Sequence, residues 1–490
     1  MPKERQKTRY VCIFLKIYYK PWTFDTGVCS IKCMRYVDLF AGCGGLSLGL
    51  DRAGFDLVLA VEKSEMASQT FYHNFIKRLS SDKEWRDYDK TSIEDQFKSK
   101  LISNELGVLL DRKELIRNLK DQSIDIVVGG PPCQGFSLAG RRNPNDARNK
   151  LPWQYLEFVE QINPKAVVIE NVVGMSRGFK KHGEEAPFEQ LQQALRETGI
   201  GYVVQAVHIN AMHYGVPEHR PRLMILALRK DIAEAKNVQA TGSLWHSAFV
   251  DELGSVPDLA PIPTVARNEV RTLRDAISNL SNPTLDVKNK NAAAFLKDMS
   301  NAKAWRLKPL DGVGIPNQNT RKHQDKAIQR FRLYQYLSGQ GLASTTLNIP
   351  AQNDREVAYI ILERVLEDAV VPAYSPDGTL LAETKPILIE LVFSMKTKKH
   401  SQRPLKWDKP SPTVVTLPDD YVHPSEPRIF TVRELARLQS FPDAFEFKAK
   451  ETTGSERRRF EVPQYSQVGN AVAPLVAYSV GKRFYEILNR

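Results

Sequence analysis

The chain has 490 residues, of which 42% are hydrophobic and 26% are charged, a globular composition that excludes a disordered or collagen-like protein. Five cysteines, an odd and small number, exclude a disulfide framework and indicate a reducing, cytoplasmic setting. Lysine and arginine (69) outnumber aspartate and glutamate (57), and this excess favours contact with a polyanion without establishing it.

The first 33 residues differ from the rest of the chain. They hold seven basic and two acidic residues and show neither a strand nor a helix period. Their apolar stretch, residues 11–19, is interrupted by Lys16 and is too short to span a bilayer. We expect residues 1–33 to be a dispensable N-terminal extension, or translation to begin at Met34. The rival interpretation is a functional basic arm that touches phosphates.

Short apolar runs alternate with helical patterns between residue 34 and about residue 230. The predicted strands are residues 35–40, 57–61, 124–128, 166–169 and 223–228, and the predicted helices include residues 46–53 and 156–162. Short all-apolar strands separated by helices indicate a parallel sheet that is buried on both faces. The sequence therefore predicts an α/β fold.

The alternation ends after this region. Residues 231–402 contain proline-rich turns, basic clusters and single amphipathic helices, which indicates a second domain. Residues 464–490 regain a helical pattern and could return to the first domain.

Unusual residues follow four of the predicted strands, namely a glycine-rich turn at residues 41–45, Glu62, Cys133 and Glu170. In an open parallel sheet, ligands gather at the carboxyl ends of the strands. The glycine turn, with Glu62 twenty residues after Gly42, suggests an adenosine-containing cofactor whose ribose Glu62 would hold. Ser47 replaces the third glycine of the dinucleotide fingerprint, which argues against a nicotinamide dehydrogenase.

Two of these strand-end residues could carry out chemistry. Cys133 follows two prolines, and its thiol would need nearby positive charge or a helix N-terminus to ionise. Glu170 would be partly desolvated, which raises its pKa so that it could hold or donate a proton. The bland alternatives are a buried packing cysteine and a satisfied structural carboxylate. No Cys-x-x-Cys or His-Glu-x-x-His spacing exists, so no metal is expected.

At residues 130–137, Gly-Pro-Pro-Cys-Gln-Gly-Phe-Ser, the chain resembles the C5-cytosine-specific DNA methyltransferases of bacterial restriction-modification systems. Further matches follow the family's order at residues 38–45, 170–172, 218–222, 433–442 and 469–472. There are two departures. Glu218 stands where the family has a glutamine, and the acidic residue that usually contacts the adenine amino group cannot be identified between Trp85 and Gln96.

The resemblance implies a Rossmann-like S-adenosylmethionine-dependent methyltransferase sheet with a smaller, irregular target-recognition domain. The implied parts are a catalytic and cofactor-binding domain at residues 34–230, a target-recognition domain at residues 231–425, and a hinge motif with a return to the catalytic domain at residues 426–490.

The resemblance also implies transfer of a methyl group from S-adenosylmethionine to C5 of a flipped-out cytosine in a specific double-stranded DNA sequence. Cys133 would add to C6, Glu170 would stabilise N3 and the amino group, and Arg222, with Arg220 as a second candidate, would hold O2 and phosphate. The implied cofactor residues are Asp38, Phe40, Gly42, Gly44, Glu62, Pro131, Leu151 and Asn470. The expected DNA contacts are Gln134, Ser137, Arg141, Arg321, Lys322 and Lys398.

The implied setting is a cytoplasmic, nucleoid-associated monomer without membrane contact. A cognate restriction endonuclease would act on the same sequence without forming a stable complex. Two alternatives remain open. A transfer-RNA cytosine methyltransferase would have a small recognition region, unlike this chain, and a catalytically dead DNA-binding regulator would not need an intact Cys133 and Glu170.

Overall fold

A computed structural model of the chain describes residues 34–132, 150–172, 187–281, 290–310, 312, 314–454, 457 and 460–490. The predicted extension, residues 1–33, lies outside the described residues. Residues 34–490 group into one unit by their contacts. Among the described residues, no helix is long and apolar enough to cross a membrane.

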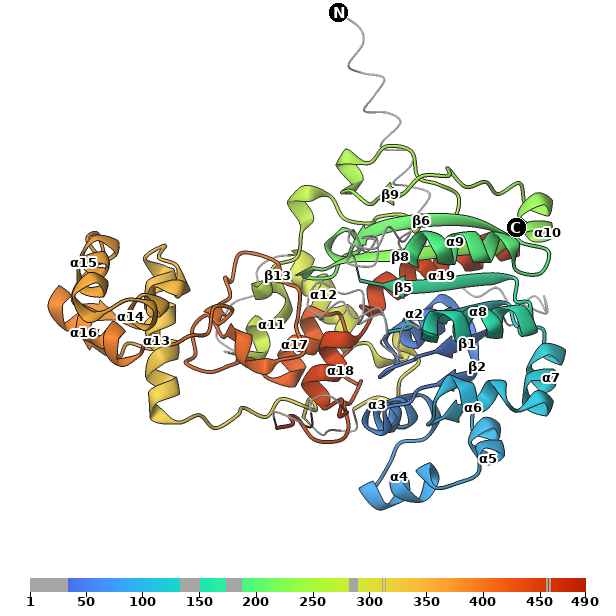
Figure 1. The fold of residues 1–490 in the computed structure, drawn as a ribbon, viewed down its shortest axis with the longest axis horizontal. Coiled ribbons are helices and arrows are strands. Elements are labelled where there is room, and N and C mark those ends of the chain that lie inside the picture. The colour runs from blue at the N-terminus through green and yellow to red at the C-terminus, as the bar shows by residue number, and fades with distance from the viewer. Residues whose placement is uncertain are drawn as a thin grey trace, which may run out of the picture. The chain divides into compact units, whose positions relative to one another are not determined.

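A central eight-stranded sheet forms the core of this unit, with the order β3-β2-β1-β4-β5-β8-β6-β9 (Figure 1). Its strands are β1 (Met34–Leu39), β2 (Phe55–Val61), β3 (Leu101–Ile102), β4 (Ile126–Gly129), β5 (Ala166–Asn171), β6 (Tyr202–Asn210), β8 (Pro221–Arg229) and β9 (Trp245–His246). Strands β2, β1, β4 and β5 are parallel neighbours, as the sequence predicts, and β3, which the sequence did not predict, joins them in parallel beside β2.

The prediction of a wholly parallel sheet is wrong at β8, which runs antiparallel to both β5 and β6. The reason is the short connection between β6 and β8. Residues 211–220 form a 3-10 turn and the two-residue strand β7 (Glu218–His219), whereas a parallel crossover needs a dozen or more residues and usually a helix. The reversal brings the first residues of β8 to the same edge as the last residues of β5, since Asn171 is paired with Leu223.

Helices cover both faces of the sheet because successive strand residues point to opposite sides. In β1, Tyr36 belongs to one hydrophobic cluster and Val37 to the other. One face packs against α2 (Gly45–Ala53), α10 (Lys230–Ala235), α11 (Leu273–Ser281), α12 (Lys290–Ser300), α17 (Val432–Leu438), α18 (Gln464–Asn470) and α19 (Pro474–Asn489). The other packs against α6 (Leu106–Leu110), α7 (Lys113–Asp121), α8 (Leu151–Ile162) and α9 (Pro187–Glu197).

A smaller aromatic cluster lies at the β2 side of the sheet. Helix α3 (Glu65–Phe71) continues into a π-helical turn at Tyr72–Ile76, and α4 (Asp82–Asp89) and α5 (Ile93–Lys98) follow before β3. Trp85 and Tyr88 of α4 are buried against Tyr72, which fastens α4 to the end of α3.

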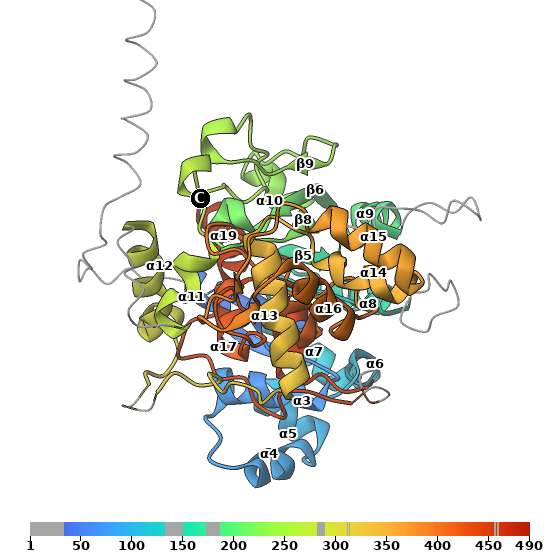
Figure 2. The ribbon, with the colours of Figure 1, turned by 90° about the vertical axis from the view of Figure 1, so that its left-hand side faces the viewer.

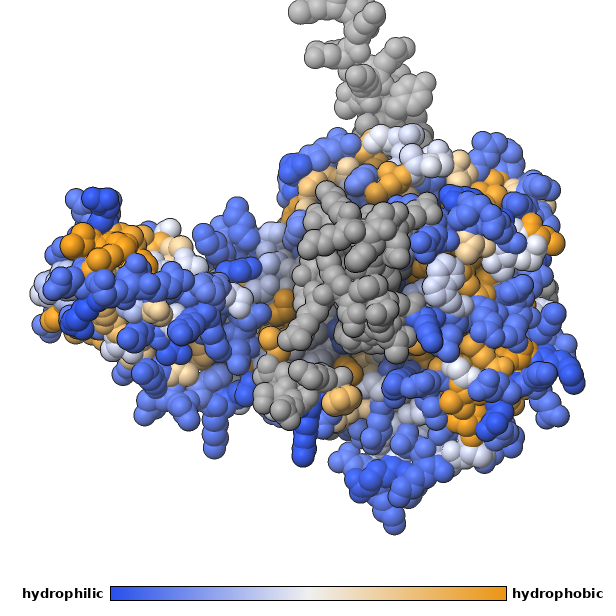
Figure 3. All heavy atoms as spheres, viewed as in Figure 1, coloured by the Kyte–Doolittle hydropathy of each residue, from blue (hydrophilic) through white to orange (hydrophobic). Residues whose placement is uncertain are grey.

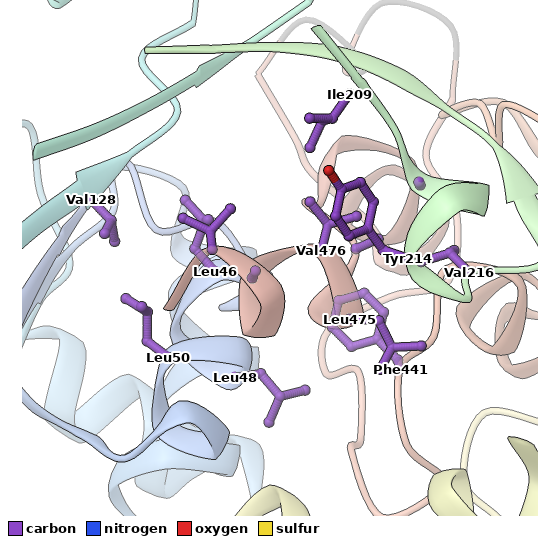
Figure 4. Close-up of a cluster of buried hydrophobic side chains, with 14 of the residues drawn as sticks. Leu46, Leu48, Leu50, Val128, Ile209, Tyr214, Val216, Phe441, Leu475 and Val476 are labelled. Carbon is purple, nitrogen blue, oxygen red and sulfur yellow. The ribbon is translucent and has the colours of Figure 1, made fainter. Parts of the chain in front are cut away.

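The last helix of the chain, α19, packs against α2, the first helix of the described residues, as the sequence suggests for residues 464–490. A side chain at Gly49 of α2 would collide with the backbone of α19 at Tyr478, and one at Gly45 would collide with the carbonyl oxygen of Val472. Only glycine permits this approach. Figure 4 shows Leu46, Leu48 and Leu50 of α2 facing the same buried region as Leu475 and Val476 of α19.

Residues 321–422, here called the lobe, contain several helices that share a hydrophobic cluster of their own (Figure 2). The lobe contains α13 (Asp325–Gly339), α14 (Ile349–Gln352), α15 (Arg355–Val365), α16 (Lys385–Ser394) and the hairpin of β10 (Ala373–Tyr374) and β11 (Leu380–Ala382). Strands β12 (Arg403–Pro404) and β14 (Tyr421–Val422) pair at its base. Helices α11 and α12 instead join the main core, so the segment predicted as a second domain contributes to two cores.

Candidate active site

The carboxyl ends of four parallel strands lie level with one another at one edge of the sheet. Leu39 is paired with both Val61 and Gly129, and Gly129 is paired with Ile169. The next residues along each strand are Phe40, Glu62, Gly130 and Glu170. The structure therefore brings together the glycine turn, Glu62 and Glu170 at the place where open α/β sheets bind ligands, and Cys133 lies outside the described residues.

The glycine turn after β1 is held by Glu62. The backbone N–H of Gly42 donates to Glu62 Oε2 at 2.8 Å, and the N–H of Ser64 donates to Oε1 at 2.6 Å. Burial raises the pKa of Glu62, which these backbone bonds partly offset. Gly42 has φ +57°, and a Cβ there would meet no atom of the described residues within 4 Å, so these residues leave space above the turn. A ligand can approach the backbone closely at this point.

Asp38 lies fully buried beneath the turn. Its Oδ2 accepts a hydrogen bond from the Ser47 hydroxyl at 2.7 Å, which explains why a serine occupies this helix position. Its Oδ1 is buried and has no hydrogen-bond partner among the described residues. Burial raises the pKa of Asp38 to about 7. A buried acceptor without a partner among the described residues fits a ligand that carries hydroxyl or ammonium donors, as S-adenosylmethionine does.

The other predicted cofactor residues occupy different surroundings. Phe40 is half-buried with a left-handed φ of +58°, and Leu151 is half-buried at the start of α8. Gly44 packs against the Phe75 ring with φ +100°, so it shapes the turn from below. Asn470 is exposed at the end of α18. The structure thus gathers Asp38, Phe40, Gly42, Glu62 and Pro131 at the sheet edge, and it places Gly44 behind them.

One residue of this edge was not given a role by the sequence. The Asn171 side-chain amide donates to the carbonyl oxygen of Pro131 at 3.0 Å, and Pro131 is buried. This bond ties the end of β5 to the backbone two residues before Cys133. Its position directly after Glu170 is the only signal that the sequence offers for it.

Glu170 and Arg222 form an ion pair at this edge. Arg222 Nε lies 3.0 Å from Glu170 Oε1, and the two side chains are 16% and 12% exposed. Burial raises the pKa of Glu170, and the neighbouring Arg222 and Arg220 lower it only in part. A Cβ on Gly130 would lie 3.1 Å from Glu170 Oε2, so the carboxyl group borders the turn that leads to Cys133. The expected desolvation of Glu170 is therefore present.

Arg220 differs from Arg222 although only one residue separates them. Its side chain is 1% exposed, and both terminal nitrogens donate to backbone carbonyl groups, including that of Gly469 at 2.7 Å. Glu218 lies beside it with Nη1 and Oε1 separated by 3.3 Å. This geometry favours a positioning role for Arg220 and leaves substrate contact as a prediction for Arg222.

Several predictions fall outside the described residues. These are the predictions for Cys133, Gln134, Ser137 and Arg141, which belong to residues 133–149. The described chain ends on one side at Pro132 and resumes at Lys150, directly before α8.

The position of the third strand explains why the sequence offers no residue for the contact to the adenine amino group. Residues 85–96 lie in α4, in α5 and in the turn between them, and Ser92 caps the start of α5 on the surface. The third strand is the later pair Leu101–Ile102, which aligns with the end of β2. The sequence search failed because a two-residue strand has no detectable period.

The basic clusters of the lobe are joined in the structure. Arg321 and Lys399 both approach the carboxylate of Asp419, at 3.6 Å each, so two clusters that are far apart in sequence share one surface. Lys322 and Lys398 are exposed. The aromatic residues between them, Phe331, Tyr334 and Tyr336, are buried in the lobe core and are packing residues. Hydrophilic side chains predominate over the lobe in Figure 3, apart from an apolar area at its outer end.

Comparisons with known proteins define the class. The model of the C-5 cytosine-specific DNA methylase family matches residues 34–486. The type II methyltransferase M.DdeI of Desulfomicrobium norvegicum is 29% identical over 93% of this chain and 90% of its own length. M.AgeI of Thalassovita gelatinovora is also 29% identical, over 92% and 98%. A crystal structure of a candidate DNA modification methyltransferase from an E. coli prophage covers 93% of this chain and all of its own, with 22% identity and a TM-score of 0.50, and it supports the fold.

The fold is that of a Rossmann-like, S-adenosylmethionine-dependent methyltransferase. The chain belongs to the C-5 cytosine-specific DNA methylase family. It is an enzyme that transfers the methyl group of S-adenosylmethionine to C5 of cytosine in DNA.

Proposed function

We propose that the enzyme modifies a flipped-out cytosine within one specific sequence of double-stranded DNA, and that it is the modification partner of a type II restriction endonuclease. The names of the two relatives support the restriction-modification setting. The endonuclease would recognise the same sequence without forming a stable complex with this chain. The enzyme would work as a monomer in the cytoplasm, associated with the nucleoid through DNA.

One observation carries the chemical part of the proposal. The Glu170–Arg222 pair borders Gly130, directly before the segment that contains Cys133, and it stands level with the cofactor turn. Methyl donor, acid and nucleophile would therefore meet at one rigid sheet edge. Bound S-adenosylmethionine supplies an electrophilic methyl group.

The residues of this chain would act on the cytosine as follows. The Cys133 thiolate forms a bond to C6, and the electron pair of the C5–C6 double bond becomes available at C5. Protonated Glu170 donates to N3 and stabilises the charge that develops in the ring, while Arg222 holds O2. After C5 has taken up the methyl group, its proton passes to water, the C5–C6 double bond re-forms from the C5–H electron pair, and the C6–Sγ pair returns to the cysteine as a thiolate. N3 returns its proton to Glu170 as the adduct breaks down. Flipping the base costs a few kcal/mol, because C6 is hidden inside a duplex.

The proposed cofactor contacts follow from the same edge. Glu62 would hold the ribose hydroxyl groups, Asp38 Oδ1 would accept a hydrogen bond from a donor of the cofactor, and Phe40 would lie against the adenine. Pro131, Leu151 and Asn470 would line the remainder.

A trapping experiment tests the nucleophile. DNA that carries 5-fluorocytosine should remain covalently attached to the wild-type enzyme, because fluorine cannot leave C5 as a proton does. The Cys133→Ser variant should bind the same DNA without forming the adduct, since a serine hydroxyl is not ionised at neutral pH. An adduct of undiminished yield in Cys133→Ser would contradict the proposal.

A second experiment tests the substrate. Methylation-sensitive sequencing of DNA from an expressing host should show 5-methylcytosine in one sequence context. Transfer of labelled methyl groups to RNA but not to duplex DNA would instead identify an RNA enzyme on the same scaffold.

A further inference from the structure

Four charged side chains form a buried row behind the proposed active site. Glu218, Arg220 and Arg222 alternate along the extended segment that enters β8, and Arg222 pairs with Glu170. The side chains of Glu218 and Arg220 are 0% and 1% exposed. When Glu170 carries a proton, Glu218 is the carboxylate of the row that opposes Arg220 and Arg222. This opposition matters because an uncompensated ion in a low-dielectric interior is strongly unfavourable.

Arg220 holds three segments of the chain together. Its Nη1 donates to the carbonyl oxygen of Val414 at 3.2 Å, and its Nη2 donates to those of Gly469 at 2.7 Å and Ala471 at 2.9 Å. The last two bonds lie on either side of Asn470. Arg220 therefore fixes the backbone of a proposed cofactor residue and the start of the strand that carries Arg222.

Glu218 contacts both Arg220 and the returning chain. Its Oε1 accepts a hydrogen bond from the Val414 N–H at 2.5 Å and lies 3.3 Å from Arg220 Nη1. Strand β7 also pairs with β13 (Ser411–Pro412), where Ser411 is opposite Glu218. The bond to Val414 needs only an acceptor oxygen, which a neutral amide would supply. A packing role therefore gives no reason for a buried negative charge at this position.

We propose that Glu218 is a positioning residue for methyl transfer: its negative charge opposes Arg220 and Arg222 and so favours the form of Glu170 that donates to cytosine N3. The inference rests on the proposed role of Glu170 as the group that donates to cytosine N3.

The electrostatics of the row support this role. Burial raises the pKa of Glu170, and Arg222 and then Arg220 lower it. Burial also raises the pKa of Glu218 itself, against the opposing effects of Arg220, the Val414 N–H and Arg222. Tyr421 faces Glu218 as well, and burial raises its pKa to about 12, so it stays neutral. Without the charge at residue 218, the charge of Arg220 would be unopposed and would lower the pKa of Glu170 further.

The test is the pH profile of methyl transfer under single-turnover conditions with saturating cofactor and DNA. If protonated Glu170 is required, the rate falls as the pH rises through its pKa. The isosteric variant Glu218→Gln should move this basic limb to lower pH by about half a unit or more. The charge-preserving variant Glu218→Asp should keep the limb near the wild-type position. Glu234→Gln, which removes an exposed carboxylate on α10, controls for the change in net charge.

The outcomes distinguish failure of the proposed role of Glu170 from failure of the inference about Glu218. Glu170→Gln should remove the basic limb, and a limb that persists in that variant overturns the proposed role of Glu170. If the limb belongs to Glu170 but has the same position in Glu218→Gln, Glu234→Gln and wild type, the inference about Glu218 is overturned. Equal shifts in Glu218→Gln and Glu218→Asp, or failure of both to fold, would make Glu218 a packing residue and overturn it as well. A folded Glu218→Asp protein beside an unfolded Glu218→Gln protein would support the inference, because it would show that the buried contacts of Arg220 need the negative charge at residue 218.

Discussion

The sheet edge and the helical lobe use charged residues in opposite ways. At the edge, Asp38, Glu170 and Arg222 are buried or nearly so, and each faces a few fixed partners. In the lobe, Lys322 and Lys398 are exposed, and Arg321 shares an exposed carboxylate with Lys399. Buried charges interact strongly and shift pKa values, whereas exposed charges are screened and contribute mainly to attraction of a polyanion. We therefore propose that the edge carries the chemistry and that the lobe contributes affinity for DNA.

The largest expected effect comes from Glu170→Gln. We expect the single-turnover rate to fall by about 10²–10⁴-fold. The amide can neither transfer a proton to cytosine N3 nor carry the negative charge that a carboxylate holds after the transfer. DNA affinity should change far less. Rapid-quench measurement of methyl transfer, together with a binding titration, checks this. A loss confined to DNA affinity would contradict the proposed division of roles, because Glu170 would then contribute to DNA binding and not to the chemical step.

Asp38→Asn should raise stability and weaken cofactor binding. Burial raises the pKa of Asp38 from 3.8 to about 7, so the folded state binds more protons than the unfolded state between these values. The unfolding free energy contributed by this group therefore falls as the pH rises through that window and stays low above it. At pH 8 the variant should gain at least about 1 kcal/mol.

Chemical denaturation at pH 5 and pH 8 measures the change, and calorimetric titration measures cofactor affinity. Asp51, whose pKa burial also raises to about 7, should retain part of the pH dependence. Ser47→Ala is the matched control, because it removes the hydrogen bond to Asp38 and keeps the acid. A stability gain at pH 8 in Ser47→Ala equal to that in Asp38→Asn would contradict this account.

Lys398→Ala should have the smallest effect. Loss of one phosphate contact reduces the slope of log affinity against log salt by about 0.9 and weakens binding to all sequences alike. The rate of the bound complex should not change. Lys83→Ala, which removes an exposed lysine on α4, is the control. Equal salt slopes in wild type and both variants would place the phosphate contacts elsewhere.

The edge could be predicted from the sequence because its signals are local. A strand followed at once by a glycine turn or an acid, as at residues 35–45 and 57–62, places those residues at the carboxyl end whatever else the chain does. The end of α2 also has a local signal in the sequence, because Gly54 caps the helix with a left-handed φ of +102°.

Other features depend on distant parts of the chain and gave no such signal. The reversal of β8 follows from pairing with β6, which the sequence did not identify as a strand. The burial of Arg220 depends on Val414, Gly469 and Ala471, which are about 200 residues or more away along the chain. The match of residues 218–222 to the family motif named Arg220 and Arg222 together, but it could not separate an arginine that holds distant backbone segments, Arg220, from one that pairs with Glu170, Arg222.

The close packing of α2 against α19 has a consequence for the order of events during synthesis. Gly45 and Gly49 lie among the first helical residues of the described chain to leave the ribosome, and the Val472 and Tyr478 backbone that they contact belongs to its last 20 or so residues. The N-terminal strands can collapse early, but the backbone against which the glycine turn and α2 pack is missing until residues 472–478 have been synthesised. Nascent chains that end before residue 472 therefore lack this support for the proposed methyl-donor site.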